Sequence, residues 1–247
     1  MKRLYYKKAM SFMVVSVAAI ILGVLQSWVG GRIFMELCKE SHYQPELYDF
    51  LNYIFVGMDI GKIPYLSKTD AWLMVQPISF LLFGVIIGGI NFLAKPKGYF
   101  QYCYVRFDKE RRFINVLFWE NLSWIFSYCI LYHITIVIMG IVYAYEVKVW
   151  DHILLPVFWG LCLKLLFMMM MKEIMLFCFF KMGMTKAVVT GITGTILLLM
   201  MNVVFHSKTN NLLLFSDQLS VNGMFFMIIV GMLCWLCNRK INLLKLE

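Results

Sequence analysis

The sequence predicts an all-α, polytopic membrane protein with six transmembrane helices and both termini in the cytoplasm. Of its 247 residues, 62% are hydrophobic and 15% are charged, and the mean hydropathy is +0.76. Soluble domains are only about 45–50% apolar. The apolar residues are also grouped into runs near the length of about 20 residues that a helix needs to cross the hydrocarbon core. We therefore expect one membrane domain over residues 1–247.

Six apolar runs are the predicted spans. They lie at about 10–30, 71–94, 114–144, 152–180, 186–205 and 224–238. The first is long for the apolar part of a cleavable signal and has no small-x-small cleavage site, so we expect it to remain as an anchor. The third and fourth are long enough to tilt or to project beyond the bilayer. The last needs a few flanking residues to reach full length.

Charge predicts the orientation. With the N-terminus inside, the inner segments (1–9, 95–121, 181–186 and 239–247) hold 15 basic and 4 acidic residues. The outer segments (32–70, 146–151 and 206–223) hold 6 basic and 9 acidic residues. Lys and Arg near the ends of spans are retained in the cytoplasm. The basic, aromatic segment Lys95–Asn121 is therefore predicted to be a cytoplasmic loop.

Two segments on the outer side leave alternatives open. In 46–57, apolar residues recur at helical spacing, which predicts an amphipathic helix that either lies on the outer interface or caps the bundle. The segment 206–223 is polar at both ends around an apolar centre at 212–215. It is either a re-entrant turn or a short surface helix.

Several functional classes are not indicated. The net charge of +9 is divided among short loops, whereas a nucleic-acid binder gathers its cations on one face.

Cys234 and Cys237 have C-x-x-C spacing but no second pair or nearby histidine, so we interpret them as apolar thiols. The four histidines are not spaced to share a metal, and none is predicted. Gly57–Ile63 fails the phosphate-loop pattern because Ile63 stands where Ser or Thr should ligate magnesium.

Three charged residues lie inside the fourth span, where charges are costly. Lys172 is near enough to the cytoplasmic end to reach water, and Glu173 is expected to pair with a cation on another helix. Lys164 and Glu173 are nine residues apart, on opposite helix faces, so they are not expected to be partners. Lys164 either lines an internal translocation path, together with Glu173, or rises along a tilted helix to water or a headgroup.

Three stretches resemble the permease subunits of type-2 ABC exporters, and more closely the small permeases of bacteriocin and lantibiotic systems of Gram-positive bacteria. They are Phe55-Val-Gly57, Trp72, and Gly98-Tyr-Phe followed by Tyr104-Val-Arg106-Phe-Asp-Lys-Glu-Arg111-Arg112-Phe and Trp119. The chain departs from the pattern in that Asp108 and Glu110 stand in the Ser-rich part and Phe113 replaces a tryptophan.

The resemblance implies a bacterial cytoplasmic membrane protein that binds no cofactor itself. ATP and magnesium would be held by a separate ATP-binding subunit, present in two copies. A second permease copy or a paralogue would complete the transporter. The residues implied in coupling to the ATPase are Phe100, Tyr104, Arg106, Arg111, Arg112 and Phe113. A loop that serves only topology and anionic lipid is the alternative.

The function expected from this resemblance is export of a hydrophobic or amphipathic peptide, or its clearance from the membrane as immunity. No catalytic site is predicted in the chain. Two other classes stay open: a membrane enzyme that processes such a peptide, and a substrate-capturing component of an importer. An enzyme would keep its activity when purified alone, whereas a permease would need an ATPase partner.

Overall fold

The computed structural model describes residues 2–40, 42–55, 71–93, 99–100, 102–103, 110–143, 151–204 and 221–240. The chain is all-α over this part, and its seven helices are α1 (Lys2–Glu40), α2 (Leu47–Phe55), α3 (Ala71–Leu93), α5 (Glu110–Val142), α6 (Asp151–Met182), α7 (Met184–Val204) and α8 (Val221–Arg239). Residues 99–100 and 102–103 are also helical. Each of the six predicted spans coincides with one of these helices.

Four of the helices in the described ranges are long and apolar enough to cross a membrane, and they contain Phe12–Glu40, Phe118–Val142, Ile153–Met182 and Met184–Met201. Shorter apolar stretches, Val75–Gly89 and Gly223–Arg239, lie in α3 and α8. By helix length and hydropathy the chain is a multi-pass membrane protein, as its composition predicts. Two helices are longer than expected: α1 extends beyond both ends of 10–30, and α5 begins at Glu110, inside the basic segment.

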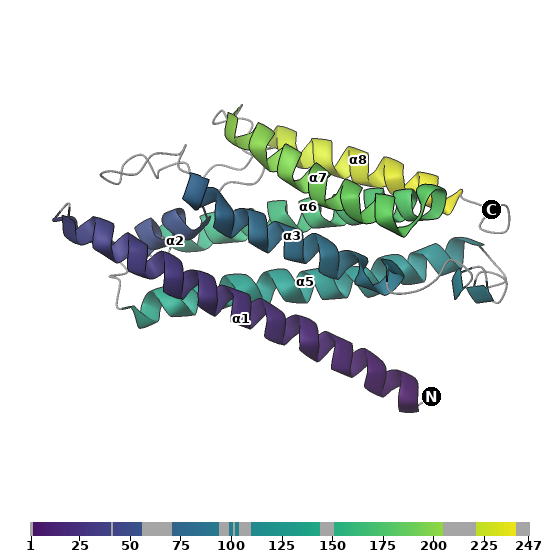
Figure 1. Ribbon diagram of the computed structural model, residues 1–247, viewed down its shortest axis with the longest axis horizontal. Coiled ribbons are helices and arrows are strands. Elements are labelled where there is room, and N and C mark those ends of the chain that lie inside the picture. The colour runs from purple at the N-terminus through teal and green to yellow at the C-terminus, as the bar shows by residue number, and fades with distance from the viewer. Residues whose placement is uncertain are drawn as a thin grey trace.

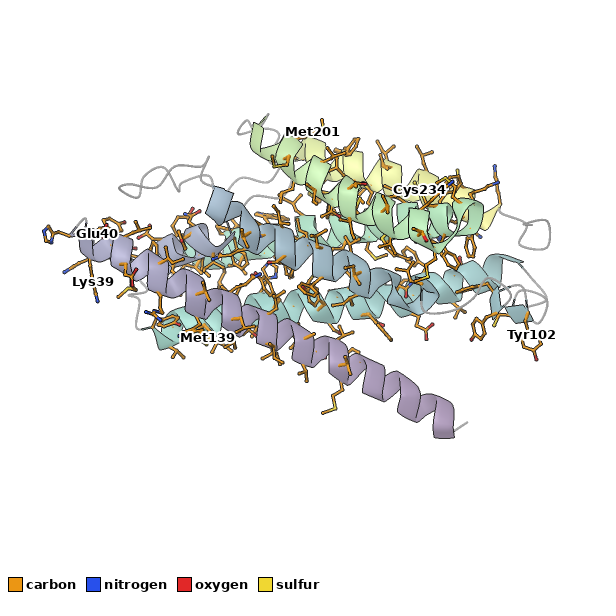
Figure 2. The ribbon with its side chains drawn as sticks, viewed as in Figure 1. Lys39, Glu40, Tyr102, Met139, Met201 and Cys234 are labelled. Carbon is orange, nitrogen blue, oxygen red and sulfur yellow. The ribbon has the colours of Figure 1, made fainter. Side chains whose placement is uncertain are left out.

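The long helices run side by side and alternate in direction (Figure 1). The helix α1 lies at one side of the bundle beside α5, and α7 and α8 lie at the other side. Figure 2 places Lys39, Glu40 and Met139 at one end of the bundle and Tyr102 at the opposite end. We call these the Glu40 end and the Tyr102 end. The start of α1 and the end of α8 are both at the Tyr102 end.

A single residue, Gly183, separates α6 from α7. Its φ of 95° lies in the left-handed region, which glycine adopts without the steric cost that a Cβ imposes. Its N–H donates to the carbonyl of Phe179 at 3.1 Å, so the last turn of α6 stays hydrogen-bonded. The two helices can therefore reverse direction at the Tyr102 end without a longer loop.

The short helix α2 is inserted into the Glu40 end of the bundle. Seven of its nine residues are buried, Phe50 and Phe55 among them. Glycines in the neighbouring helices make room for it: a Cβ at Gly30 of α1 would lie 2.6 Å from Ile54, and one at Gly140 of α5 would lie 2.9 Å from Phe50. This helix therefore caps the bundle. The alternative, in which 46–57 lies on an outer interface, is wrong for the described part of that segment.

Candidate functional site

Lys164 of α6 is buried where α2, α3 and α5 meet. Only 1% of it is exposed, and its ammonium lies 4.1 Å from the ring centre of Phe55 and 5.9 Å from that of Phe80. Its Nζ has no hydrogen-bond partner among the described residues. Lys164 therefore does not rise to water or to a headgroup, and that alternative is wrong. The ammonium is instead held against aromatic faces, as in a cation–π contact.

His133 of α5 completes this group. It is 3% exposed, and its ring stacks on Phe55 with the two ring centres 4.9 Å apart. Its Nδ1 lies 2.8 Å from the carbonyl of Cys129, which can only accept, so Nδ1 carries the proton. In the neutral ring Nε2 is then an acceptor, and it has no hydrogen-bond partner in the described part of the chain. Lys164 lies close enough to interact electrostatically with His133 and Cys129.

A polar network beside this group joins three helices. The Tyr132 hydroxyl of α5 donates to Oε1 of Gln26 in α1. The amide of Gln26 in turn donates to Ser79 Oγ at 2.6 Å and to the carbonyl of Gln76 at 3.2 Å, both in α3. Hydrogen bonds between neighbouring spans hold helices together where hydrophobicity cannot, because lipid is as apolar as the helix surface. The network fixes α1, α3 and α5 around the Lys164 site.

A second charged group lies closer to the Tyr102 end. Lys172 and Glu173, adjacent in α6, form an ion pair in which both side chains are buried. Asn238 of α8 donates to Glu173 Oε2 at 2.8 Å and to its backbone carbonyl at 3.1 Å. The Lys172 ammonium also lies 4.8 Å from the ring centre of Phe118 in α5. A buried pair of this kind requires further hydrogen bonds to offset the loss of hydration, and Asn238 supplies one to the carboxylate.

This pairing corrects two expectations. Lys172 does not extend to water, because its ammonium is retained inside the bundle by Glu173 and Phe118. Glu173 pairs with its own sequence neighbour, whereas a cation on another helix was expected. The separation of Lys164 from Glu173 is confirmed: Lys164 contacts the rings of α2 and α3, and Glu173 contacts α8.

The basic, aromatic segment is described only in part. Phe100 is buried and packs edge-on against Phe179 and Phe180 of α6, with ring centres 5.5 and 5.9 Å away. Its ring is therefore enclosed by this chain. Tyr99 and Tyr102 are 43% and 57% exposed. A side-chain hydrogen bond between Tyr99 and Cys103, together with partial burial, raises the pKa of Tyr99.

The other residues implied in coupling are less completely placed. Arg111, Arg112 and Phe113 belong to the first turn of α5, so they continue a span rather than forming a separate loop helix. Tyr104 and Arg106 lie outside the described residues, as does most of the segment 206–223.

Sequence reasoning missed several residues of these groups. His133 was considered only as a metal ligand, although a lone polar residue in a span is itself a signal. Phe80 and Asn238 carried no signal, because aromatic residues are common in spans and Asn238 lies at a helix end. Phe55 was noted only within 46–57 and the stretch Phe55-Val-Gly57, where nothing indicated a contact with Lys164. The described residues contain no group of three or more His, Cys, Asp or Glu side chains placed to hold a metal. No model of a protein family, no curated protein and no solved structure matches this chain.

Proposed function

We propose that this chain is the permease subunit of an ABC transporter that exports a hydrophobic or amphipathic peptide or clears it from the membrane. In this proposal all six long helices cross the bacterial cytoplasmic membrane, with both termini inside. Two permease subunits, identical or related, form the pathway. Two copies of a separate ATP-binding subunit supply the work of ATP hydrolysis.

The observation that carries the proposal is the burial of Phe100 against α6. Its ring packs on Phe179 and Phe180, at the Tyr102 end of the helix that also holds Lys164 and Glu173. Packed aromatic contacts of this kind transmit displacement, because closely packed interiors are poorly compressible. A force applied to the segment around Phe100 would therefore move α6 and the charged groups inside the bundle.

Exposed tyrosines on the same segment supply a surface on which a partner could exert that force. Tyr99 directly precedes Phe100, Tyr102 follows it by two residues, and both are exposed. Figure 2 shows Tyr102 at the Tyr102 end of the bundle. Tyrosine is enriched among residues that dominate binding energy, since it buries a large, rigid area. In the proposal, Phe100 joins the segment to α6 while Tyr99 and Tyr102 contact the ATP-binding subunit.

The charge distribution supports the proposed side. Most basic residues at the ends of the described helices lie at the Tyr102 end, where Lys181 is in the last turn of α6, Lys186 is in the first turn of α7, and Arg239 and Lys240 end α8. The cationic start of α1 is at the same end (Figure 1). Lys39, in the last turn of α1, lies at the Glu40 end. Lys and Arg at span ends favour the cytoplasmic side, where a soluble ATPase would be found.

The test is purification of the tagged chain from its native membrane, followed by mass spectrometry of the proteins that accompany it. An ATP-binding subunit should be recovered, and inactivating its nucleotide site should abolish transport or immunity in cells. Tyr102→Ala should lower its recovery at least about tenfold. The matched control is Phe225→Ala, because Phe225 is equally exposed but lies in the first turns of α8, whose opposite end is at the Tyr102 end.

One result would contradict the proposed permease function, and another would contradict only the proposed contact surface. If the chain is purified without any nucleotide-binding subunit, and is active alone, it is not a permease of this kind. If the ATPase is recovered equally well with Tyr99→Ala and Tyr102→Ala together, the proposed contact surface is wrong.

A further inference from the structure

Lys164 and His133 are two buried polar groups that meet the same phenyl ring and have polar atoms without partners among the described residues. The ammonium of Lys164 is 4.1 Å from the centre of the Phe55 ring, and the imidazole of His133 is stacked on that ring. Neither Lys164 Nζ nor His133 Nε2 makes a hydrogen bond there. Buried polar side chains are nearly always paired, so each such exception requires an explanation.

No ion pair within the described ranges explains Lys164. The buried carboxylate of the same helix, Glu173, is engaged by Lys172 and Asn238 and faces α8. The contacts with Phe55 and Phe80 offset only part of the cost of an unpaired ammonium inside a bundle, since a cation–π contact contributes less than full hydration. Among the residues that the structure describes, the site thus has a cationic donor and no anionic acceptor.

His133 determines which second hydrogen-bonding group a ligand of this site must carry. Because its Nδ1–H donates to the Cys129 carbonyl, its Nε2 presents a lone pair in the neutral ring. Lys164 therefore requires an acceptor, whereas His133 requires a donor. A ligand that satisfies both carries an anionic oxygen with a hydroxyl or N–H group close by. A peptide C-terminus has this pair in its carboxylate and last amide, and the headgroup of phosphatidylglycerol has it in its phosphate and glycerol hydroxyls.

The ring that covers the ammonium belongs to a small, separate element. Phe55 is the last residue of α2, a helix of nine residues that caps the Glu40 end (Figure 1). Displacement of this one side chain would remove the ring that contacts Lys164 and His133 most closely, while Phe80 would still lie beside both. Phe55 and an anionic ligand would then compete for the same ammonium.

We propose that Lys164 and His133 form a binding site for a ligand that carries an anionic oxygen beside a hydrogen-bond donor, and that Phe55 occupies this site when the ligand is absent. The inference rests on the proposed function only for the use of the site in transport. Binding itself is a property of this chain and requires no ATPase.

The experiment measures thermal unfolding of the purified chain in neutral detergent during titration with two probes. The first is an acetylated apolar tetrapeptide with a free C-terminal carboxylate, and its control is the same peptide with a C-terminal amide. The second is phosphatidylglycerol, and its control is phosphatidylcholine. At least one anionic probe should raise the unfolding temperature, and the controls should not. Phe55→Leu should tighten binding about tenfold by removing the competing ring.

Lys164→Met separates a binding role from a structural one. If the ammonium awaits a ligand, this variant loses the response to the probe yet unfolds at a higher temperature than the native chain without ligand, because an unpaired buried charge is gone. Lys39→Met, an exposed lysine at the Glu40 end, should leave the response unchanged. His133→Phe keeps a ring to stack on Phe55 and should weaken binding.

The responses to the probes show whether the site exists and which class of ligand it binds. A response to the peptide acid alone identifies a peptide carboxylate, a response to phosphatidylglycerol alone identifies a lipid headgroup, and a response to both supports a site open to either. No response to any probe, or an equal response in Lys164→Met, would overturn it. Lys164-dependent binding without an ATPase partner in the membrane would leave the site in place and remove the proposed function.

Discussion

The ammonium of Lys164 and the ring of Phe55 lie 4.1 Å apart and join α6 to the last residue of α2. Because the Phe55 ring also stacks on His133, this one side chain of α2 contacts both α5 and α6. The contact explains how a nine-residue helix, too short to be stable alone, remains seated in the bundle.

The energy of this contact is measurable by a double-mutant cycle. We expect Phe55→Leu and Lys164→Met to show a coupling of about 0.5–2 kcal/mol in the free energy of unfolding, the range of a partly desolvated cation–π pair. The measurement is unfolding of the detergent-solubilised protein by a denaturing detergent. The control cycle combines Phe55→Leu with Lys39→Met and should show no coupling. Strict additivity in both cycles would show that the Phe55 ring does not stabilise the ammonium.

The buried pair in α6 predicts an asymmetric response to mutation. Glu173→Gln should lower the unfolding free energy by about 3–5 kcal/mol, because Lys172 is left buried without its counter-charge. Adding Lys172→Met to the same chain should recover most of that loss, since no charge then remains. Glu36→Gln, at an exposed carboxylate of α1, serves as the control. A double variant as unstable as Glu173→Gln alone would contradict the account.

The close approach of α2 to α5 predicts that Gly140 tolerates no side chain. A Cβ there would lie 2.9 Å from Phe50 Cδ1 and would also meet Leu47, so Gly140→Ala should cost about 1–3 kcal/mol of unfolding free energy. Gly231→Ala is the matched control, because its Cβ would meet Met170 only at 3.7 Å, an ordinary contact. The control should be neutral or slightly stabilising, since Ala favours helix over Gly. Equal effects at the two positions would refute the steric explanation.

The hydrogen bond from Tyr43 to Asp49 predicts a dependence of stability on alkaline pH. Tyr43 Oη donates to Asp49 Oδ2 at 2.9 Å, and burial, followed by this bond, raises the pKa of Tyr43 from 10.0 to about 12. The resulting contribution to stability is fully present below pH 10 and is lost as the pH rises to about 12. The unfolding temperature of the native chain should therefore fall more steeply over this interval than that of Tyr43→Phe. Parallel curves would show that the phenol is not held by Asp49.

The sequence predicted helix positions well because spans are defined by length and hydropathy, which are local properties. The ranges 71–94, 152–180 and 186–205 agree closely with α3, α6 and α7. Boundaries at the polar ends were less predictable: α5 begins at Glu110 because charged residues are compatible with a helix that extends beyond an apolar core. Opposite helix faces for Lys164 and Glu173 also followed directly from helical periodicity.

The partners of the buried charges were not predictable in the same way. Lys172 was expected to reach water, and it is instead retained by Glu173 and the ring of Phe118. The choice depends on whether α8 places Asn238 beside the carboxylate, which no local pattern encodes. Phe100 was expected to meet another protein, and it packs on Phe179 and Phe180 of its own chain.

By itself, the sequence determined that this chain is helical and embedded in a membrane, because hydrophobic length and residue periodicity act along a single helix. Only the tertiary structure decided that α2 enters the bundle, that Phe55 covers Lys164, and that His133 faces the same ring. These relationships depend on packing among helices distant in sequence, where a glycine on one helix admits a side chain from another. Contacts of that kind arise only once the bundle has formed.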